Sequence, residues 1–136
     1  MDVCWQALEK NEWAEVVLRA VFSVLPSREL PPLLQADNPG PFYFGNAERV
    51  NETLLSAGFS RIELKPFEQR MHFGAAMTLD EAVDYALEIG PAARAIADAD
   101  SALLPAFRRA LASALAPFVG EAGVWLGGAV FLVTAR

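Results

Sequence analysis

The chain passes from a strand into a helix along the stretch Val3-Cys4-Trp5-Gln6-Ala7-Leu8-Glu9-Lys10-Asn11-Glu12-Trp13. Its first three residues are apolar and are typical of a strand end. From Asn11 onward the apolar residues recur at helical spacing, so a helix is predicted, with Asn11 as its N-cap and Pro26 as its stop. The apolar stripe of this helix consists of Trp13, Val16, Val17, Ala20, Val21 and Val24.

A proline-rich connection follows and leads into a helix and a strand. Residues 26–45 are predicted to form a loop that folds back over the domain, because three aromatic residues stand together at its end, at 42–44. Asn46 is predicted to cap a short helix with Val50 and Leu54 turned inward, and Gly58 to end it in the left-handed conformation. Arg61 to Met71 is predicted to be a strand, and Pro66 within it implies a sheet edge or a bulge.

The C-terminal half is predicted to hold three helices and the last strand. Thr78-Leu79-Asp80-Glu81 forms a capping box that opens a helix, and Gly90-Pro91 ends it and starts another. A longer helix is predicted from Ser101 to Phe118. Two strand segments follow, Val124–Leu126 and Ala129–Thr134, and the second is apolar enough to be covered on both faces.

Chain length, charge and cysteine count limit the number of domains and the kinds of partner that are expected. A chain of 136 residues is predicted to be a single domain, residues 1–136. Its net charge of -6 argues against a nucleic-acid partner, because phosphates repel an acidic surface. No apolar run reaches the ~18–20 residues that a membrane span needs, so no membrane association is expected. The single cysteine excludes an internal disulfide, and no export signal is visible, which predicts a cytoplasmic protein.

Three stretches carry a resemblance to a known family. They are Cys4-Trp5-Gln6 with Asn11-Glu12-Trp13, then Pro39-Gly40-Pro41-Phe42 with the helix that ends in Ala57-Gly58-Phe59, and last Ala129 to Arg136. In this order and spacing the chain resembles the C-terminal half of class I S-adenosylmethionine-dependent methyltransferases of the small-molecule type. The resemblance covers nearly the whole chain, although no single stretch is diagnostic.

The resemblance implies a fold and a missing part. The expected fold class is α/β, an α+β-like remnant of a Rossmann-like methyltransferase fold, with a small mixed sheet of about three strands covered by four to five helices. The last strand is expected to lie antiparallel between the other two. The family's cofactor-binding half is expected to be absent, as in a truncated enzyme, and no Gly-x-Gly-x-Gly pattern occurs here. No cofactor is therefore predicted for this chain alone, and S-adenosylmethionine is implied only for the complete fold.

The resemblance also implies an acceptor-binding side, for which the sequence offers five candidates. Aromatic side chains can enclose a flat or apolar acceptor, and an amide can orient a polar group on it. A plainer interpretation stays open, in which Trp13 is core and Asn11 is only a helix cap. The predicted substrate-binding residues are Trp5, Asn11, Trp13, Phe42 and Tyr43.

Other chemistry-bearing residues form no predicted site. His72 is the only histidine and has no visible partner, so an ordinary histidine is favoured over a general base. One histidine and one cysteine, Cys4, do not make a metal site. No serine has the Gly-x-Ser-x-Gly context of a hydrolase nucleophile. The catalytic residues stay unassigned.

Two functions remain open at this level. The chain is either the acceptor-binding part of a methyltransferase, inactive alone, or a free-standing module that binds a small apolar molecule or pairs with itself. A small α+β enzyme that works by itself has no supporting constellation. Both leading hypotheses predict an open sheet edge near Val3 to Trp5, and hence a homodimer or a complex with a cofactor-binding partner.

Overall fold

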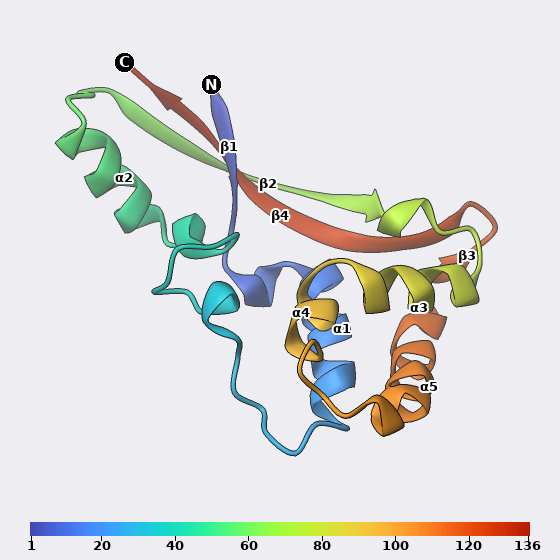
Figure 1. Ribbon diagram of the computed structural model, residues 1–136. Helices are drawn as coiled ribbons and strands as arrows, with labels where there is room; N and C mark the ends of the chain where they lie inside the picture. Colours follow the sequence, from blue (N-terminus) through green and yellow to red (C-terminus); the bar gives the residue numbers. More distant parts are fainter.

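The computed structural model describes residues 1–136, and its centre is an antiparallel sheet (Figure 1). Strand β4 (Gly123–Ala135) lies between β1 (Asp2–Trp5) and β2 (Ile62–His72) and is antiparallel to both. A fourth strand, β3 (Val119–Gly120), forms a hairpin with the start of β4. The predicted place of the last strand is confirmed. The prediction of a mixed sheet is wrong, because a central strand antiparallel to both neighbours leaves no parallel pair.

The two long strands form the continuous part of the sheet. Their register runs without a break from Ile62 opposite Ala135 to His72 opposite Trp125. The predicted division of β4 into two segments is therefore wrong. The glycine pair at 127–128 stays inside the strand because β2 pairs along that whole length. Pro66 lies on β2, which is an edge strand, as its lack of an amide hydrogen required.

The five α-helices divide between the two ends of the sheet. Four gather beneath the end where β4 begins (Figure 1), namely α1 (Glu12–Phe22), α3 (Leu79–Glu88), α4 (Pro91–Ala95) and α5 (Leu104–Leu115). Helix α2 (Ala47–Ser56) lies near the other end, where both termini lie. Short 3₁₀ turns span Leu8–Lys10, Pro32–Leu34, Tyr43–Gly45, Phe73–Ala75, Ser101–Leu103 and Ala116–Phe118. None of the helices has both the length and the apolar character needed to cross a bilayer.

The helical end holds the main hydrophobic core. The α1 stripe is buried at Val17, Ala20 and Val21, against residues of α3, α5 and β4. Helix α1 also buries its other side, with Ala14 and Leu18, in a smaller cluster that the stripe did not predict. This second cluster includes Leu34 and Phe42, so the proline-rich loop does fold back over the domain.

The cover over β4 is uneven along its length. Val124 and Leu126 are buried under the helices, whereas Val130 and Leu132, on the same face, are only half-buried. The expectation that the second half of this strand is covered on both faces is therefore not met. The neighbours of these residues on that face, Val3 and Phe67, are 55% and 44% exposed.

Local signals fix most helix ends as predicted. The Asn46 side chain accepts hydrogen bonds from the first turn of α2, and the Thr78 side chain accepts one from the backbone of Glu81. Gly58, at φ +96°, closes α2 with the amide of Phe59 bonded back to the carbonyl of Leu54. Asn11 is the exception, since it stands at the N-cap position of α1 but its side chain makes no capping bond.

The buried and exposed leucines of α5 allow a matched test of this core. Leu111→Ala, at a site with 0% exposure, is expected to lower the free energy of unfolding by about 2–5 kcal/mol through lost burial and a cavity. Leu104→Ala, at a 45% exposed site, is expected to cost less than about 1 kcal/mol. Urea unfolding followed by circular dichroism measures both. Equal losses would contradict the assignment of the α5 face.

Candidate functional site

The Asn11 side chain joins the start of α1 to the central strand. Its Nδ2 donates to the carbonyls of Gln6 and Ala7, each at 3.1 Å. Its Oδ1 accepts from the indole of Trp13 at 3.0 Å and from the backbone N–H of Ala129 at 2.8 Å. All of its donors and acceptors are thus used, and the residue is fully buried.

This amide replaces a backbone pairing at the point where β1 leaves the sheet. The backbone N–H of Gln6 still donates to the carbonyl of Ala129, at 2.9 Å. The second backbone bond of this pair would run from the Ala129 N–H to the Gln6 carbonyl. The Asn11 side chain replaces it, because its Oδ1 accepts from that N–H and its Nδ2 donates to that carbonyl. Further along β4, the Glu12 carboxylate accepts from the N–H of Gly127 at 3.1 Å. The Gln6 side-chain amide donates to the carbonyl of Val130 at 2.9 Å. We call Gln6, Asn11 and Glu12 the edge cap, since their side chains continue the bonding of β4 where β1 ends.

Three predicted site aromatics form a contiguous stack beside the edge cap. The ring centroids of Trp5 and Trp13 lie 5.0 Å apart, and those of Trp13 and Phe42 lie 6.0 Å apart. Phe42 is buried in the smaller core cluster, while both tryptophans are half-buried. The structure therefore brings Trp5, Asn11, Trp13 and Phe42 together.

Tyr43 is the predicted residue that does not join this group. Its ring contacts Phe44, with the centroids 5.1 Å apart, and lies under the guanidinium of Arg49 at 4.5 Å. The same guanidinium donates to the Tyr43 carbonyl and to the carboxylate of Asp37. Tyr43 thus belongs to a surface network that holds the loop against α2.

One of the five candidate residues, Trp13, lines a cavity, and the chain neighbours of Trp5 and Tyr43 line a second. Trp13 lines a cavity of about 70 Å³ together with Met71, Phe73 and Tyr85. A larger and more open groove of about 200 Å³ runs between β1 and α2. Its walls are Asp2, Val3, Cys4, Phe44, Val50, Thr53, Leu54 and Val133. Both cavities are smaller than the ~300–1,000 Å³ of ordinary ligand pockets.

The groove residues were not predicted as a site. The sequence predicts Val50 and Leu54 as the inward face of α2, but that pattern does not separate packing from the wall of a groove. It marks Phe44 only as one of three loop aromatics. The edge-cap residues Gln6 and Glu12 were also missed, because their bonding partners on β4 lie more than a hundred residues away in the sequence.

The Asn11 bonding bears on its predicted role. With every donor and acceptor occupied, the side chain offers no group that can orient a ligand, so the structure gives that role no support. The hydrogen bonds of this side chain stabilise the fold instead. The aromatic residues Trp5 and Trp13 are the predicted residues that keep partial exposure at this place.

The reactive side chains lie apart from one another. His72 stacks on Trp125, with ring centroids 4.8 Å apart, and its Nε2 is 2.8 Å from the Ala76 carbonyl oxygen. Burial, assisted by the charge of Asp2, raises the pKa of the Cys4 thiol, and the backbone N–H of Phe131 partly offsets the rise. No hydrogen bond joins a cysteine, a histidine and a carboxylate, and no three such residues are placed to hold a metal ion.

No protein-family model matches this chain, and neither does any curated protein.

Removal of the Asn11 side chain is expected to destabilise the fold strongly. Asn11→Ala leaves buried backbone and indole groups without partners, for a loss of about 2–4 kcal/mol in the free energy of unfolding. Asn11→Asp keeps the size but loses both donors, so it is also expected to destabilise. The control Asn51→Ala, at an exposed position on α2, is expected to change stability by less than about 0.5 kcal/mol. Thermal denaturation of the three variants measures this, and a stable Asn11→Ala would contradict the bridging role.

The environment of Cys4 predicts slow alkylation. A raised pKa leaves less thiolate at any given pH, and the thiolate is the reacting form. Iodoacetamide at pH 8 is expected to modify the folded chain more slowly than the same chain in urea. Mass spectrometry over time measures both rates. Equal rates would show that the folded environment does not protect the thiol.

Proposed function

We propose that this chain is the acceptor-binding portion of an S-adenosylmethionine-dependent methyltransferase, inactive without a cofactor-binding partner. The supporting observation is the strand order β1-β4-β2, with β4 antiparallel to both neighbours. This is the order that the sequence resemblance predicts for the last three strands of that family. A cytoplasmic location is part of the same proposal and rests on the single cysteine, which leaves no internal disulfide.

The position of the aromatic stack supports an acceptor-binding role. In open, largely parallel α/β sheets, which the resemblance implies only for the complete family fold, ligands bind beyond the carboxyl ends of the strands. Trp5 is the last residue of β1, and Trp13 follows it at the start of α1. The adjoining cavity of about 70 Å³ is too small to enclose an acceptor molecule. A partner that supplies another wall would complete the site, and a small apolar acceptor suits its aromatic and aliphatic lining.

The groove between β1 and α2 favours a second candidate function, a free-standing module that binds a small apolar molecule. Its volume of about 200 Å³ fits a group no larger than a benzene derivative or a short aliphatic chain. Thr53→Trp would fill this groove from α2 without touching the aromatic stack. Binding of a benzene derivative that this substitution abolishes would favour the module over the methyltransferase portion.

Calorimetric titration tests the first proposal. The chain alone is expected to give no saturating heat with S-adenosylmethionine or S-adenosylhomocysteine, because it contains no glycine-rich turn between a strand and a helix. Mixed with the separately expressed cofactor-binding half of a methyltransferase of the resembled type, it is expected to form a one-to-one complex that binds S-adenosylhomocysteine.

Each component alone serves as the control for that mixture. Saturating heat at micromolar cofactor with this chain alone would contradict the proposal, since the cofactor site would then lie within the chain. Absence of any complex with the added half, measured by size-exclusion chromatography, would also count against it.

A further inference from the structure

The two edges of the sheet differ in how they are protected. The edge strand β2 carries Pro66 and a series of charged residues, among them Lys65, Glu68 and Arg70. Proline and charge are the usual means by which natural edges avoid pairing with another chain. The opposite edge, β1, has no proline or bulge, and Asp2 is its only charged residue.

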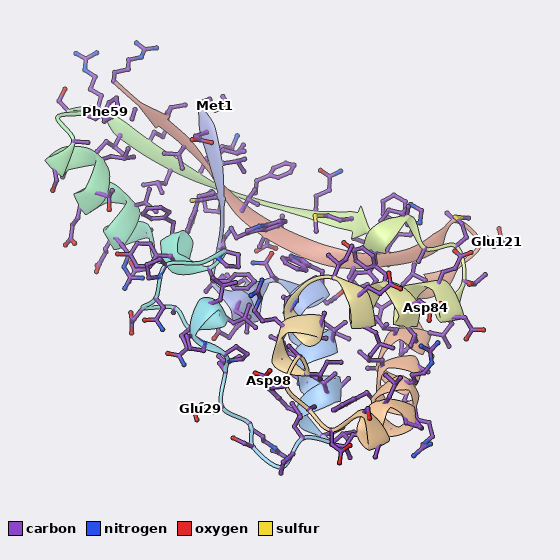
Figure 2. All side chains as sticks on the ribbon, viewed as in Figure 1. Met1, Glu29, Phe59, Asp84, Asp98 and Glu121 are labelled. Atoms are coloured by element: carbon purple, nitrogen blue, oxygen red, sulfur yellow. The ribbon has the colours of Figure 1, made fainter.

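The hydrogen-bond alternation identifies the free groups of β1. Because the N–H of Gln6 bonds to Ala129, the alternation of an antiparallel pair directs the backbone groups of Asp2 and Cys4 toward β4. The N–H and C=O groups of Val3 and Trp5 therefore point away from the sheet. The Asp2 carboxylate accepts from the Val3 N–H at 2.8 Å, which covers one of these groups. Figure 2 shows Met1 at the outer end of this strand, clear of the helical core.

We propose that two copies of this chain pair antiparallel through β1, with Val3 opposite the partner's Trp5 and Cys4 opposite the partner's Cys4. Outward groups can pair only with outward groups, so Val3 and Trp5 of one copy must meet the same residues of the other. This register uses all of their free backbone groups and is symmetric about a two-fold axis at Cys4.

Side chains favour the same register. Val3, 55% exposed in the single chain, gains an aromatic cross-strand neighbour in the partner's Trp5. Asp2 lies opposite the uncharged Gln6 of the partner copy, so like charges do not face each other across the pair. A register with Val3 opposite Val3 would leave Trp5 opposite Met1, which is outside the strand. This pairing rests on the β1 edge and does not depend on the proposed methyltransferase role.

Sedimentation over roughly 10 µM to 1 mM tests the association, since so small a contact gives a weak dimer. The unaltered chain is expected to shift from monomer toward dimer over this range. Val3→Lys, with circular dichroism to confirm folding, is expected to weaken dimerisation at least tenfold. Leu55→Lys, at a 52% exposed position on α2, is the matched control and is expected to leave it unchanged. Asp2→Ala is expected to strengthen it, because the Val3 N–H becomes free.

Oxidation of the single cysteine tests the register. Opposed residues of a non-hydrogen-bonded antiparallel pair have Cα atoms about 4.5 Å apart, within the ~4.4–6.8 Å span of a disulfide. Copper-phenanthroline at pH 8.5 is expected to yield a disulfide dimer from the unaltered chain and from Leu55→Lys, but little from Val3→Lys.

Three results would overturn the proposal. A monomer throughout the concentration range would do so, and so would a dimer that Val3→Lys leaves intact. A dimer sensitive to Val3→Lys but not trapped by oxidation would overturn the register, and with it the two-fold pairing at Cys4.

Discussion

The bridging amide of Asn11 is the contact on which the rest of this structure depends. An antiparallel pair normally exchanges two backbone bonds between opposed residues, and here the pair Gln6–Ala129 exchanges one while Asn11 carries the other. The insertion ends β1 and lets the chain turn into α1 without leaving a buried group of β4 unpaired. The same side chain binds the Trp13 indole, which fixes that ring against Trp5. One residue thus determines where β1 leaves the sheet and how the aromatic stack is placed.

Local patterns predicted the elements well where the cause is local. The capping side chains of Asn46 and Thr78, the glycine at 58 and the apolar stripe of α1 each act within a few residues of one another, and the structure contains all of them. Asn11 shows the limit of such signals. An asparagine before a helix predicts a cap, but its Oδ1 accepts instead from the Trp13 indole and from the backbone N–H of Ala129, 118 residues away. A hydrogen bond between residues so far apart in the chain produces no recognisable spacing of residue types in the sequence. The same holds for the bonds from Gln6 and Glu12 to β4.

The candidate site was predictable to the extent that its residues are near one another in the chain. Trp5, Asn11 and Trp13 flank one turn, so any fold that pairs β1 with β4 brings them together. Phe42 joins them from the loop because the proline-rich segment folds back, as its aromatics indicated. Tyr43 diverges from Phe42 because its ring packs against Phe44 and under the guanidinium of Arg49, whereas Phe42 is buried in the smaller core cluster.

The free edge of β1 connects the two proposals, because a strand edge accepts one neighbour at a time. A cofactor-binding partner that extends the sheet and a second copy of this chain would both need the outward groups of Val3 and Trp5, so the two states exclude each other. In the single chain the Asp2 carboxylate already occupies one of those groups, at the Val3 N–H. Any strand that docks here must displace it, and the freed carboxylate then regains its hydration. The affinity of this edge for either neighbour is therefore set in part by the Asp2 carboxylate, which competes with the incoming strand for the Val3 N–H.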